Sequence, residues 1–570
     1  MADKPQNVAT SSFSFGENLL ISVQQSKPYE DSKTFVDMPL ISDGEAVKLN
    51  FEEMVKRTAA QNLTVSKEVL KKFLTENFRA AGSDLVPWNP PDWRPEPEGF
   101  LPAVQEEAMR IWALQVHALW HLLGKRISPE VCRHPSRHTI LSLPHPMMVP
   151  GDRFREAYYW DSYWVVRGLL VSGMLDTAGK VVENLMALLD THGYVPNGAR
   201  SYYLNRSQPP LLSQMVMALW EASKDRRWLK QALPLLLREH SFFTEPPKAV
   251  WIVDEKGCSH CLSRYYASWE KPRPESWWED AALAEGLPPE EAAALYRNLA
   301  SAAESGWDFS SRWFSHEGEV DGRGGLTTTR TTSVVPADLN ALLYQMERNI
   351  AHAARKLEAI DVASKFEASA ARRLRAMDAL LWDPEGCQWR DYILQGICSD
   401  SSRVANAEDV AGADCPLGLW RGMRSTAVCA SNFVGLWCGC VEPGSPRALS
   451  AVEALRASGL VLPGGVSTTL RQTGEQWDFP NAWPPLQHMI IEGLNTAGGD
   501  PGATFAKQLA RRWVLASRSA FDKTGHMHEK LDATAVGAVG SGGEYNPQVG
   551  FGWSNGVVLS LLETFGWPIV

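Results

Sequence analysis

Long apolar segments are missing from this chain of 570 residues. Residues 1–20 lack the charged start and apolar run of a signal peptide, and the longest charge-free stretch, 425–441, contains serine, asparagine and two glycines. Neither stretch has the roughly 20 apolar residues that a membrane-spanning helix needs. As written, the sequence indicates a soluble protein with no membrane segment.

Basic runs are missing as well. The net charge is −10 at neutral pH, and no lysine- or arginine-rich segment offsets it. Proteins whose main partner is nucleic acid or an anionic membrane carry such positive charge. We therefore expect no nucleic-acid partner.

Motifs for several kinds of catalysis are also absent. No glycine-rich loop follows a strand as in nucleotide-binding proteins, and no GxSxG nucleophile motif occurs. The nine cysteines are unpatterned, and the group Cys258, His260 and Cys261 is not followed by a second pair at zinc-site spacing. These absences predict no metal site and no organic cofactor, and they favour reduced cysteines over a disulfide framework.

Tryptophan, in contrast, is abundant, with 23 residues against 13 tyrosines and 19 phenylalanines. One interpretation is a large buried core, because indole rings pack well there. The other is a carbohydrate cleft, in which flat aromatic faces meet sugar C–H groups and indole N–H groups bond hydroxyls. Composition alone leaves both open.

The pattern of apolar residues predicts a mainly α protein. The first 45 residues are polar and aperiodic, which predicts a tail or irregular arm over 1–45. No linker divides residues 46–570, which we expect to form one large helical domain. Apolar residues recur at three- and four-residue steps, and Asp338 is placed to cap the second of these helices. The predicted helices are 174–190, 340–360, 213–224, 447–458 and 503–518.

Polar and aromatic residues cluster between these helices. The segment 150–164, PGDRFREAYYWDSYW, sets Arg153 and Asp161 beside Trp160, so a simple Arg–Asp pair holding an aromatic loop is one reading. Further clusters are NGARSYYLNRSQPP (197–210) and KPRPESWW (271–278). Rigid loops flanked by proline present side chains at low entropic cost, as a binding site requires.

Two more clusters supply carboxylates. Asp308 lies in ESGWDFSSRW (304–313) between aromatic residues, where burial would raise its pKa as a general acid requires; pairing with Arg312 or the local backbone is an equally good reading. The C-terminal region contains QWDFPNAWPP (476–485), Glu529 in HMHEK, and a glycine-rich loop with Glu544. These clusters contain many carboxylates, arginines, amides and indoles but no group of metal ligands. Such a composition suits glycoside hydrolysis, which needs one carboxylic acid and one carboxylate.

These segments carry a resemblance to a known family. PGDRFREAYYWDSYW and QWDFPNAWPP resemble the two signature segments of the trehalases, glycoside hydrolase family thirty-seven, and the RSQPP, RPES, GWDFSSRW, HEK and GGEY segments follow in that family's order. The similarity spans roughly residues 50–570 and is greatest to plant members. It implies an all-α (α/α)6 toroid with the active-site cleft in long loops, and hydrolysis of α,α-trehalose to two glucoses with inversion.

The resemblance also implies roles for particular residues. Asp308 matches the family's general acid and Glu529 its general base, with no cofactor. Ser207 and Gly306 are expected to act mainly through backbone geometry. The implied substrate contacts are Arg153, Trp160, Asp161, Asn197, Arg206, Ser207, Gln208, Arg273, Glu275, Gly306 and Glu544.

Two positions depart from the family pattern: Asp152, where a small residue is usual, and Ser541, which replaces a glycine. The glycosylation sequon at Asn205 precedes Arg206, so we expect it to be unused. We expect a monomer that binds trehalose. Its location is open, either cytoplasmic or, if an anchor is absent from this version of the sequence, outward-facing at the plasma membrane as in many plant relatives. Another inverting α-glucosidase on the same fold, or a catalytically silent trehalose sensor, are the alternative functions.

Overall fold

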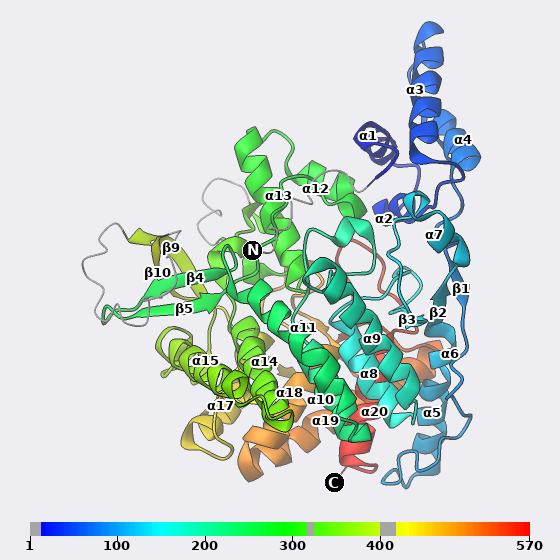
Figure 1. Cartoon of the computed structure of the whole chain (residues 1–570). Helices are drawn as coiled ribbons and strands as arrows, with labels where there is room; N and C mark the ends of the chain where they lie inside the picture. The colour runs from blue at the N-terminus through cyan, green and yellow to red at the C-terminus, as the bar shows by residue number, and fades with distance from the viewer. Residues whose placement is uncertain (1–12, 316–323, 399–417, 570) are drawn as a thin grey trace.

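The computed structural model describes residues 13–315, 324–398 and 418–569 (Figure 1). It is rich in helices, joined by long loops. The helices are α1 (Glu17–Ser26), α2 (Ser32–Val36), α3 (Gly44–Ala60), α4 (Lys67–Asn77), α5 (Glu107–Ala118), α6 (Trp120–Leu123), α7 (Pro129–Arg133), α8 (Asp161–Val171), α9 (Leu175–His192), α10 (Leu212–Ser223), α11 (Arg227–Thr244), α12 (Trp277–Leu283), α13 (Pro289–Glu304), α14 (Ala337–Lys356), α15 (Ile360–Leu380), α16 (Val434–Trp437), α17 (Pro446–Ala457), α18 (Pro484–Ala497), α19 (Gly499–Thr524) and α20 (Gly552–Phe565).

The predicted helices are all present, and local chemistry sets their ends. α17 begins at Pro446 after Ser445, whose side chain accepts a hydrogen bond from the Ala448 amide. α9 ends at His192, and the residue after it, Gly193, has a φ of 85° that favours glycine. The predicted cap of α14 was wrong: Pro336 is the N-cap residue, and the Asp338 carboxylate instead binds Arg312.

Six helices make a closed series of contacts. α8, α10, α14, α16, α18 and α20 each contact the next, and α20 contacts α8. Helices α9, α11, α15 and α19 pack against members of this series, and α5 packs against α20. Segments that are far apart in the sequence, such as α8 and α20, therefore lie side by side (Figure 1).

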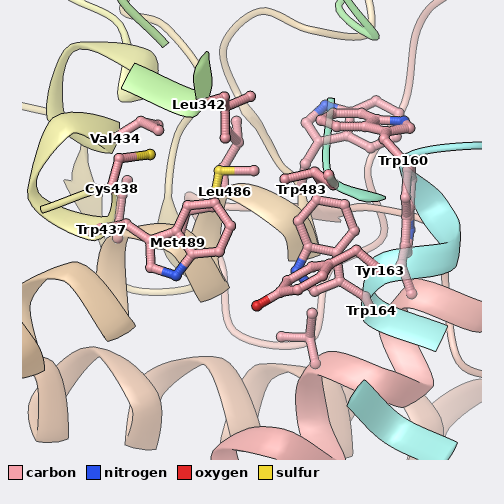
Figure 2. Close-up of a cluster of buried hydrophobic side chains, with 14 of the residues drawn as sticks. Trp160, Tyr163, Trp164, Leu342, Val434, Trp437, Cys438, Trp483, Leu486 and Met489 are labelled. Atoms are coloured by element: carbon pink, nitrogen blue, oxygen red, sulfur yellow. The ribbon is translucent and has the colours of Figure 1, made fainter. Parts of the chain in front are cut away.

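The core lies where these six helices meet. Figure 2 shows part of it, with Tyr163 and Trp164 from α8, Leu342 from α14, Trp437 from α16, and Leu486 and Met489 from α18. Trp160 and Trp483 extend this buried cluster toward the loops. Much of the tryptophan is thus core, as the first interpretation of the composition proposed.

Small sheets correct the all-α prediction. One sheet has the strand order β5-β4-β10-β9-β6, another has β1-β2-β3, and three pairs of short strands complete the set in the described residues. Most of these strands are too short to show a periodic pattern in the sequence. They are β1 (Leu85–Pro87), β2 (Gly124–Ile127), β3 (Met147–Met148), β4 (Ala249–Val253), β5 (Ser259–Ser263), β6 (Val334–Val335), β7 (Trp382–Asp383), β8 (Gln388–Trp389), β9 (Tyr392–Cys398), β10 (Leu419–Arg424), β11 (Val461–Leu462), β12 (Gly465–Val466), β13 (Asn481–Ala482) and β14 (Leu531–Asp532).

The N-terminal segment also differs from the prediction of a tail or irregular arm. Residues 1–12 lie outside the described residues, but residues 13–45 contain α1, α2 and the start of α3. Phe13, Phe15, Leu19 and Phe35 are buried with Tyr202 and other residues in a second apolar cluster. These apolar residues are too irregularly spaced to form one helical face, because two short helices and a turn bring them together. α3 and α4 extend away from the helical body (Figure 1).

No helix in the described ranges 13–315, 324–398 and 418–569 is both long and apolar enough to cross a membrane.

Candidate active site

One pocket gathers nearly all of the predicted site residues. Together with the open space at its mouth it measures about 660 Å³, and it is built mainly from the loops that join the helices. Of the predicted residues, only Ser207 does not line it. Those that do are Arg153, Trp160, Asp161, Asn197, Arg206, Gln208, Arg273, Glu275, Gly306, Asp308, Glu529 and Glu544.

Arg153 enters the pocket from the loop before α8. Its guanidinium forms a bidentate ion pair with Asp31, with Nε–Oδ2 at 2.6 Å and Nη2–Oδ1 at 2.9 Å. The guanidinium also lies 4.4 Å from the ring centroid of Tyr545. The reading of Arg153 and Asp161 as a structural pair is therefore wrong, because a residue of the N-terminal segment is the partner.

Arg206 is held by three oxygen acceptors. Its Nε donates to Asn197 Oδ1 at 2.9 Å, Nη1 donates to Asn205 Oδ1 at 3.1 Å, and Nη2 bonds Glu275. Burial opposes ionisation of Glu275, but the charges of Arg206 and Arg273 outweigh it and hold its pKa below the ordinary value. This side of the pocket presents an ordered set of donors and acceptors.

Ser207 and Gln208 fix the backbone around Arg206. The Ser207 amide donates to Glu304 Oε1 at 3.0 Å, and its hydroxyl donates to the Val195 carbonyl at 2.6 Å. Gln208 Oε1 accepts from the Trp160 amide at 3.1 Å. Ser207 therefore holds the local backbone through these two bonds and does not line the pocket.

Arg273 pairs with two carboxylates. Its Nε and Nη2 bond Asp280 at 2.9 and 2.6 Å, and Nη2 also bonds Glu544 Oε1 at 3.1 Å. Glu544 Oε2 accepts from the Ser276 hydroxyl at 3.1 Å. The Arg273 loop and the glycine-rich C-terminal loop are joined in this way.

Asp308 lines the pocket, and its neighbours in the sequence, Trp307 and Phe309, are buried. Its carboxyl makes no side-chain hydrogen bond to another described residue, and Arg312 is occupied by Asp338 and Asp391. Burial raises the pKa of Asp308 to about 7; the Arg273 charge opposes this, and the Glu544 charge adds to it. The alternative reading of Asp308 as the partner of Arg312 is therefore wrong, whereas a hydrogen bond with its own backbone is present and lowers its pKa.

The backbone of Asp308 is fixed from the second signature segment. Gln476 Nε2 donates to the Asp308 carbonyl at 2.6 Å. Asp478 accepts from the Ser311 amide at 2.9 Å and from the hydroxyls of Ser310 and Ser311. These bonds order the loop that carries the carboxyl.

Glu529 follows α19, and the pairing of β13 with β14 brings it beside the second signature segment. Tyr545 donates its hydroxyl to Oε1 at 2.7 Å, and the Gln548 amide donates to Oε2 at 3.0 Å. Burial raises the pKa of Glu529, while Lys530 and these hydrogen bonds oppose the shift. Burial also lowers the pKa of Lys530 to about 8, against the charges of Glu529 and Asp308.

A third buried carboxyl, Asp161, begins α8 within the same pocket. Burial is the main cause that raises its pKa to about 8; a backbone hydrogen bond opposes the shift, and the charges of Glu529 and Asp308 contribute to it. The pocket therefore holds carboxyl groups that resist simultaneous ionisation.

Tryptophan rings form one wall of the pocket. Trp477 stacks on Trp483 with centroids 3.9 Å apart, and Trp160 packs against Trp477. Gly306 has φ 74°, and a Cβ there would lie 2.7 Å from Trp160 Cζ2, so only glycine fits. Tryptophan is therefore found both in the core and at the wall of the pocket.

Some pocket and supporting residues were missed by the sequence reasoning. Tyr545 follows Glu544, and Gln476 begins the second signature segment. Their positions in these segments could have indicated that they belong to the pocket. No feature of the sequence pointed to Asp31, because it lies 122 residues before Arg153 in a segment predicted to be a tail. The missed residues of this kind are Asp31, Asp280, Gln476, Tyr545 and Gln548.

The departures from the family pattern lie outside the contacts described above. Asp152 is exposed and lines a different hollow. Ser541 has an exposed side chain and an ordinary φ, since the positive φ values fall on Gly542 and Gly543. Asn205 is bonded to Arg206 and its Nδ2 is buried, which agrees with the expectation that its sequon is unused.

The Cys258, His260 and Cys261 group lies on and beside β5. His260 Nε2 is 2.9 Å from Asp254 Oδ2. Within the described part of the chain, no group of three or more His, Cys, Asp or Glu could hold a metal ion.

Known proteins match this sequence over nearly its whole length. The sequence model of the trehalase family matches residues 27–566. The chain belongs to the trehalase family. The match begins at residue 27, so it includes Asp31 and most of the segment predicted to be a tail.

Curated trehalases are similar to this trehalase-family chain along most of their own lengths. A probable trehalase of Oryza sativa subsp. japonica is 42% identical over 548 residues, covering 94% of this chain and 92% of the relative. The trehalase of Arabidopsis thaliana is 41% identical, covering 95% and 83%, and that of Homo sapiens is 39% identical, covering 96% and 88%. Among solved structures, neutral trehalase Nth1 from Saccharomyces cerevisiae has a TM-score of 0.55 at 25% identity, covering 73% of each chain.

Proposed function

We propose that this protein is an inverting α,α-trehalase, in which Asp308 is the general acid and Glu529 the general base. Membership of the trehalase family supports hydrolysis of trehalose. The observation that carries the assignment of roles is one pocket that contains both carboxyls together with three paired arginines. Retention of this whole set makes a catalytically silent sensor a weaker candidate.

Asp308 suits the role of acid because it must be protonated before it donates to the glycosidic oxygen. With a pKa raised to about 7, a large fraction of this carboxyl is neutral in mildly acidic to neutral solution. No hydrogen-bond donor from another described side chain stabilises its ionised form. The proton is therefore available to the leaving oxygen.

Glu529 suits the role of base because two donors stabilise its carboxylate. Tyr545 and the Gln548 amide bond its two oxygens and favour the charged form. In an inverting reaction this carboxylate takes a proton from the water that attacks the anomeric carbon on the face opposite the leaving group. The carboxyls of such a pair stand about 6.5–9.5 Å apart, which leaves room for that water.

The remaining polar groups bind sugar hydroxyls in this proposal. Arg153, Arg206 and Arg273 are each fixed by a carboxylate, so they meet the substrate in one orientation. Ordered charged donors of this kind satisfy hydroxyl groups that would otherwise be unpaired in a dry pocket. The tryptophan wall contacts the C–H face of the sugar.

We further infer that the six helices of the closed contact series form the inner ring of an (α/α)6 toroid. The contacts of α5, α9, α11, α15 and α19 support an outer ring, in which α17 completes the set. The pocket would then lie at the end of the ring where the loops gather. Side chains from loops distant in the sequence meet there.

Release of glucose from different disaccharides tests the proposed substrate. Purified protein is incubated separately with α,α-trehalose, maltose and sucrose. Glucose is expected from trehalose only. Comparable release from maltose would contradict the proposed specificity and favour another α-glucosidase.

A further inference from the structure

The N-terminal segment contacts both sides of the pocket. On one side Asp31 binds Arg153. On the other, Gln24 Nε2 donates to the Pro274 carbonyl at 3.2 Å, next to Arg273, and the Ser32 hydroxyl donates to Glu279 Oε2 at 2.8 Å. The segment therefore braces two of the loops that carry pocket arginines.

We propose that Asp31 is a positioning residue of the active site, which holds the Arg153 guanidinium in its working orientation. The inference rests on the proposed function, because it deepens the role of Arg153 in the trehalose pocket. Arg153 is 13% exposed and Asp31 31% exposed, so water only partly screens the pair. A bidentate ion pair fixes the plane of a guanidinium as well as its position.

The orientation of Arg153 matters for Glu529. The guanidinium lies over the ring of Tyr545, whose hydroxyl bonds Glu529 Oε1. The Arg153 amide donates to Gln548 Oε1 at 3.1 Å, and the Gln548 amide bonds Glu529 Oε2. Asp31 is thus connected, through Arg153, to both residues that hold the proposed base.

The segment that carries Asp31 is itself fixed to the body. Lys33 Nζ lies 2.6 Å from Asp37 Oδ2 and 2.8 Å from Glu156 Oε1, and Arg200 bonds Glu156 at 2.7 Å. All four side chains are fully buried. Because these charges are paired inside the protein, α2 is a rigid support rather than a loose arm.

Asp31 also caps α2. The test must therefore separate the loss of this cap from the loss of the ion pair with Arg153. Its Oδ1 accepts from the Lys33 amide at 2.9 Å. Asparagine caps helices about as well as aspartate but cannot form the ion pair. Asp31→Asn therefore removes the ion pair with Arg153 and keeps the helix cap. Asp31→Glu keeps the negative charge on a longer side chain.

The experiment measures kcat and KM for trehalose with these variants, and the melting temperature of each. Asp31→Asn is expected to lower kcat/KM by about 10- to 100-fold, as for loss of a hydrogen-bonded charge partner, with a melting temperature close to wild type. Asp31→Glu should recover part of this loss. Glu17→Gln is the matched control, because Glu17 belongs to the same segment but pairs with Lys271 at the surface, and it should leave kcat/KM unchanged.

A double-mutant cycle tests whether Asp31 acts through Arg153. In an Arg153→Met background, Asp31→Asn should change kcat/KM by less than about twofold, since the shared interaction is already lost. Wild-type kcat and KM in Asp31→Asn would overturn the inference. So would an equal loss with and without Arg153.

Failure of the proposed function can be distinguished from failure of this inference. In that case the wild-type protein itself would not cleave trehalose. Crystal structures of wild-type protein and Asp31→Asn then decide the inference alone: a displaced Arg153 guanidinium supports it, and an unchanged one overturns it.

Discussion

Asp308 and Glu529 are carboxyls of the same buried pocket, but their surroundings differ. Glu529 accepts hydrogen bonds from a tyrosine hydroxyl and a backbone amide. Asp308 receives none from another described side chain, and its sequence neighbours Trp307 and Phe309 are buried. Burial raises the pKa of both groups. Hydrogen bonds from other residues oppose this rise for Glu529 but not for Asp308.

In the proposed mechanism, this difference lets one pocket keep an acid and a base at the same pH. A carboxyl with fewer hydrogen-bond donors holds its proton more firmly, and a carboxylate with more donors gives it up more readily. The two proposed roles would therefore follow from neighbouring residues rather than from the choice between aspartate and glutamate.

The largest expected effect comes from removing either carboxyl. Asp308→Asn and Glu529→Gln should each lower kcat on trehalose by about 10²–10⁴-fold or more, because one proton transfer is lost. Steady-state glucose release measures this, with circular dichroism to verify folding. Near-wild-type turnover in either folded variant would contradict its assigned role.

A substrate with a better leaving group separates the two roles. Fluoride needs less proton donation than a sugar alkoxide, so Asp308→Asn should lose less activity on α-glucosyl fluoride than on trehalose. Glu529→Gln should lose activity on both substrates, since each reaction needs an activated water. Equal losses for Asp308→Asn on both substrates would argue against Asp308 as the acid.

A smaller effect is expected at Tyr545. Tyr545→Phe removes a donor to Glu529, so the pKa of Glu529 should rise, because this bond lowers it in the wild type. The base must be ionised, so the acidic limb of the kcat/KM–pH profile should move up by about one pH unit. An acidic limb that stays in place would show that this bond does not tune the base.

The basic limb is controlled from the other side of the pocket. Activity should fall as pH rises through about 7, where Asp308 loses its proton. Glu544 raises the pKa of Asp308, so Glu544→Gln should move this limb to lower pH by less than about one unit. A shift to higher pH would mean that another group sets the basic limb.

The smallest effect is expected at Asp152. This exposed residue does not line the pocket, so Asp152→Gly should change kcat/KM by less than about twofold. The same assay of trehalose hydrolysis measures it. A tenfold change would mean that the charge beside Arg153 does influence the pocket.

The long helices and most of the pocket could be predicted from the sequence. α9 and α19 have apolar residues at regular helical steps, and Arg206 and Arg273 stand in compact motifs. The short strands could not be predicted, because β13 and β14 have two residues each and form only when distant loops meet. The partner of Arg153 was equally hidden, since an ion pair between residues 31 and 153 leaves no periodic pattern.

Asp338 illustrates a further limit. Its position before an apolar run suggested a helix cap, but a buried arginine competes for the same carboxylate. Asp338 binds Arg312 and the Leu339 amide from inside the first turn of α14, so it does not stand at the cap position. A helix cap predicted from local sequence takes no account of a distant arginine that binds the same carboxylate.

Proton NMR of the first products tests most directly whether the two carboxyls catalyse hydrolysis with inversion. Purified protein is mixed with α,α-trehalose and the anomeric signals of glucose are followed from the first seconds, before mutarotation. Equal amounts of α-glucose and β-glucose are expected, since inversion at one ring gives the β anomer and the leaving sugar remains α. Release of α-glucose alone would mean retention and would contradict the role assigned to Glu529.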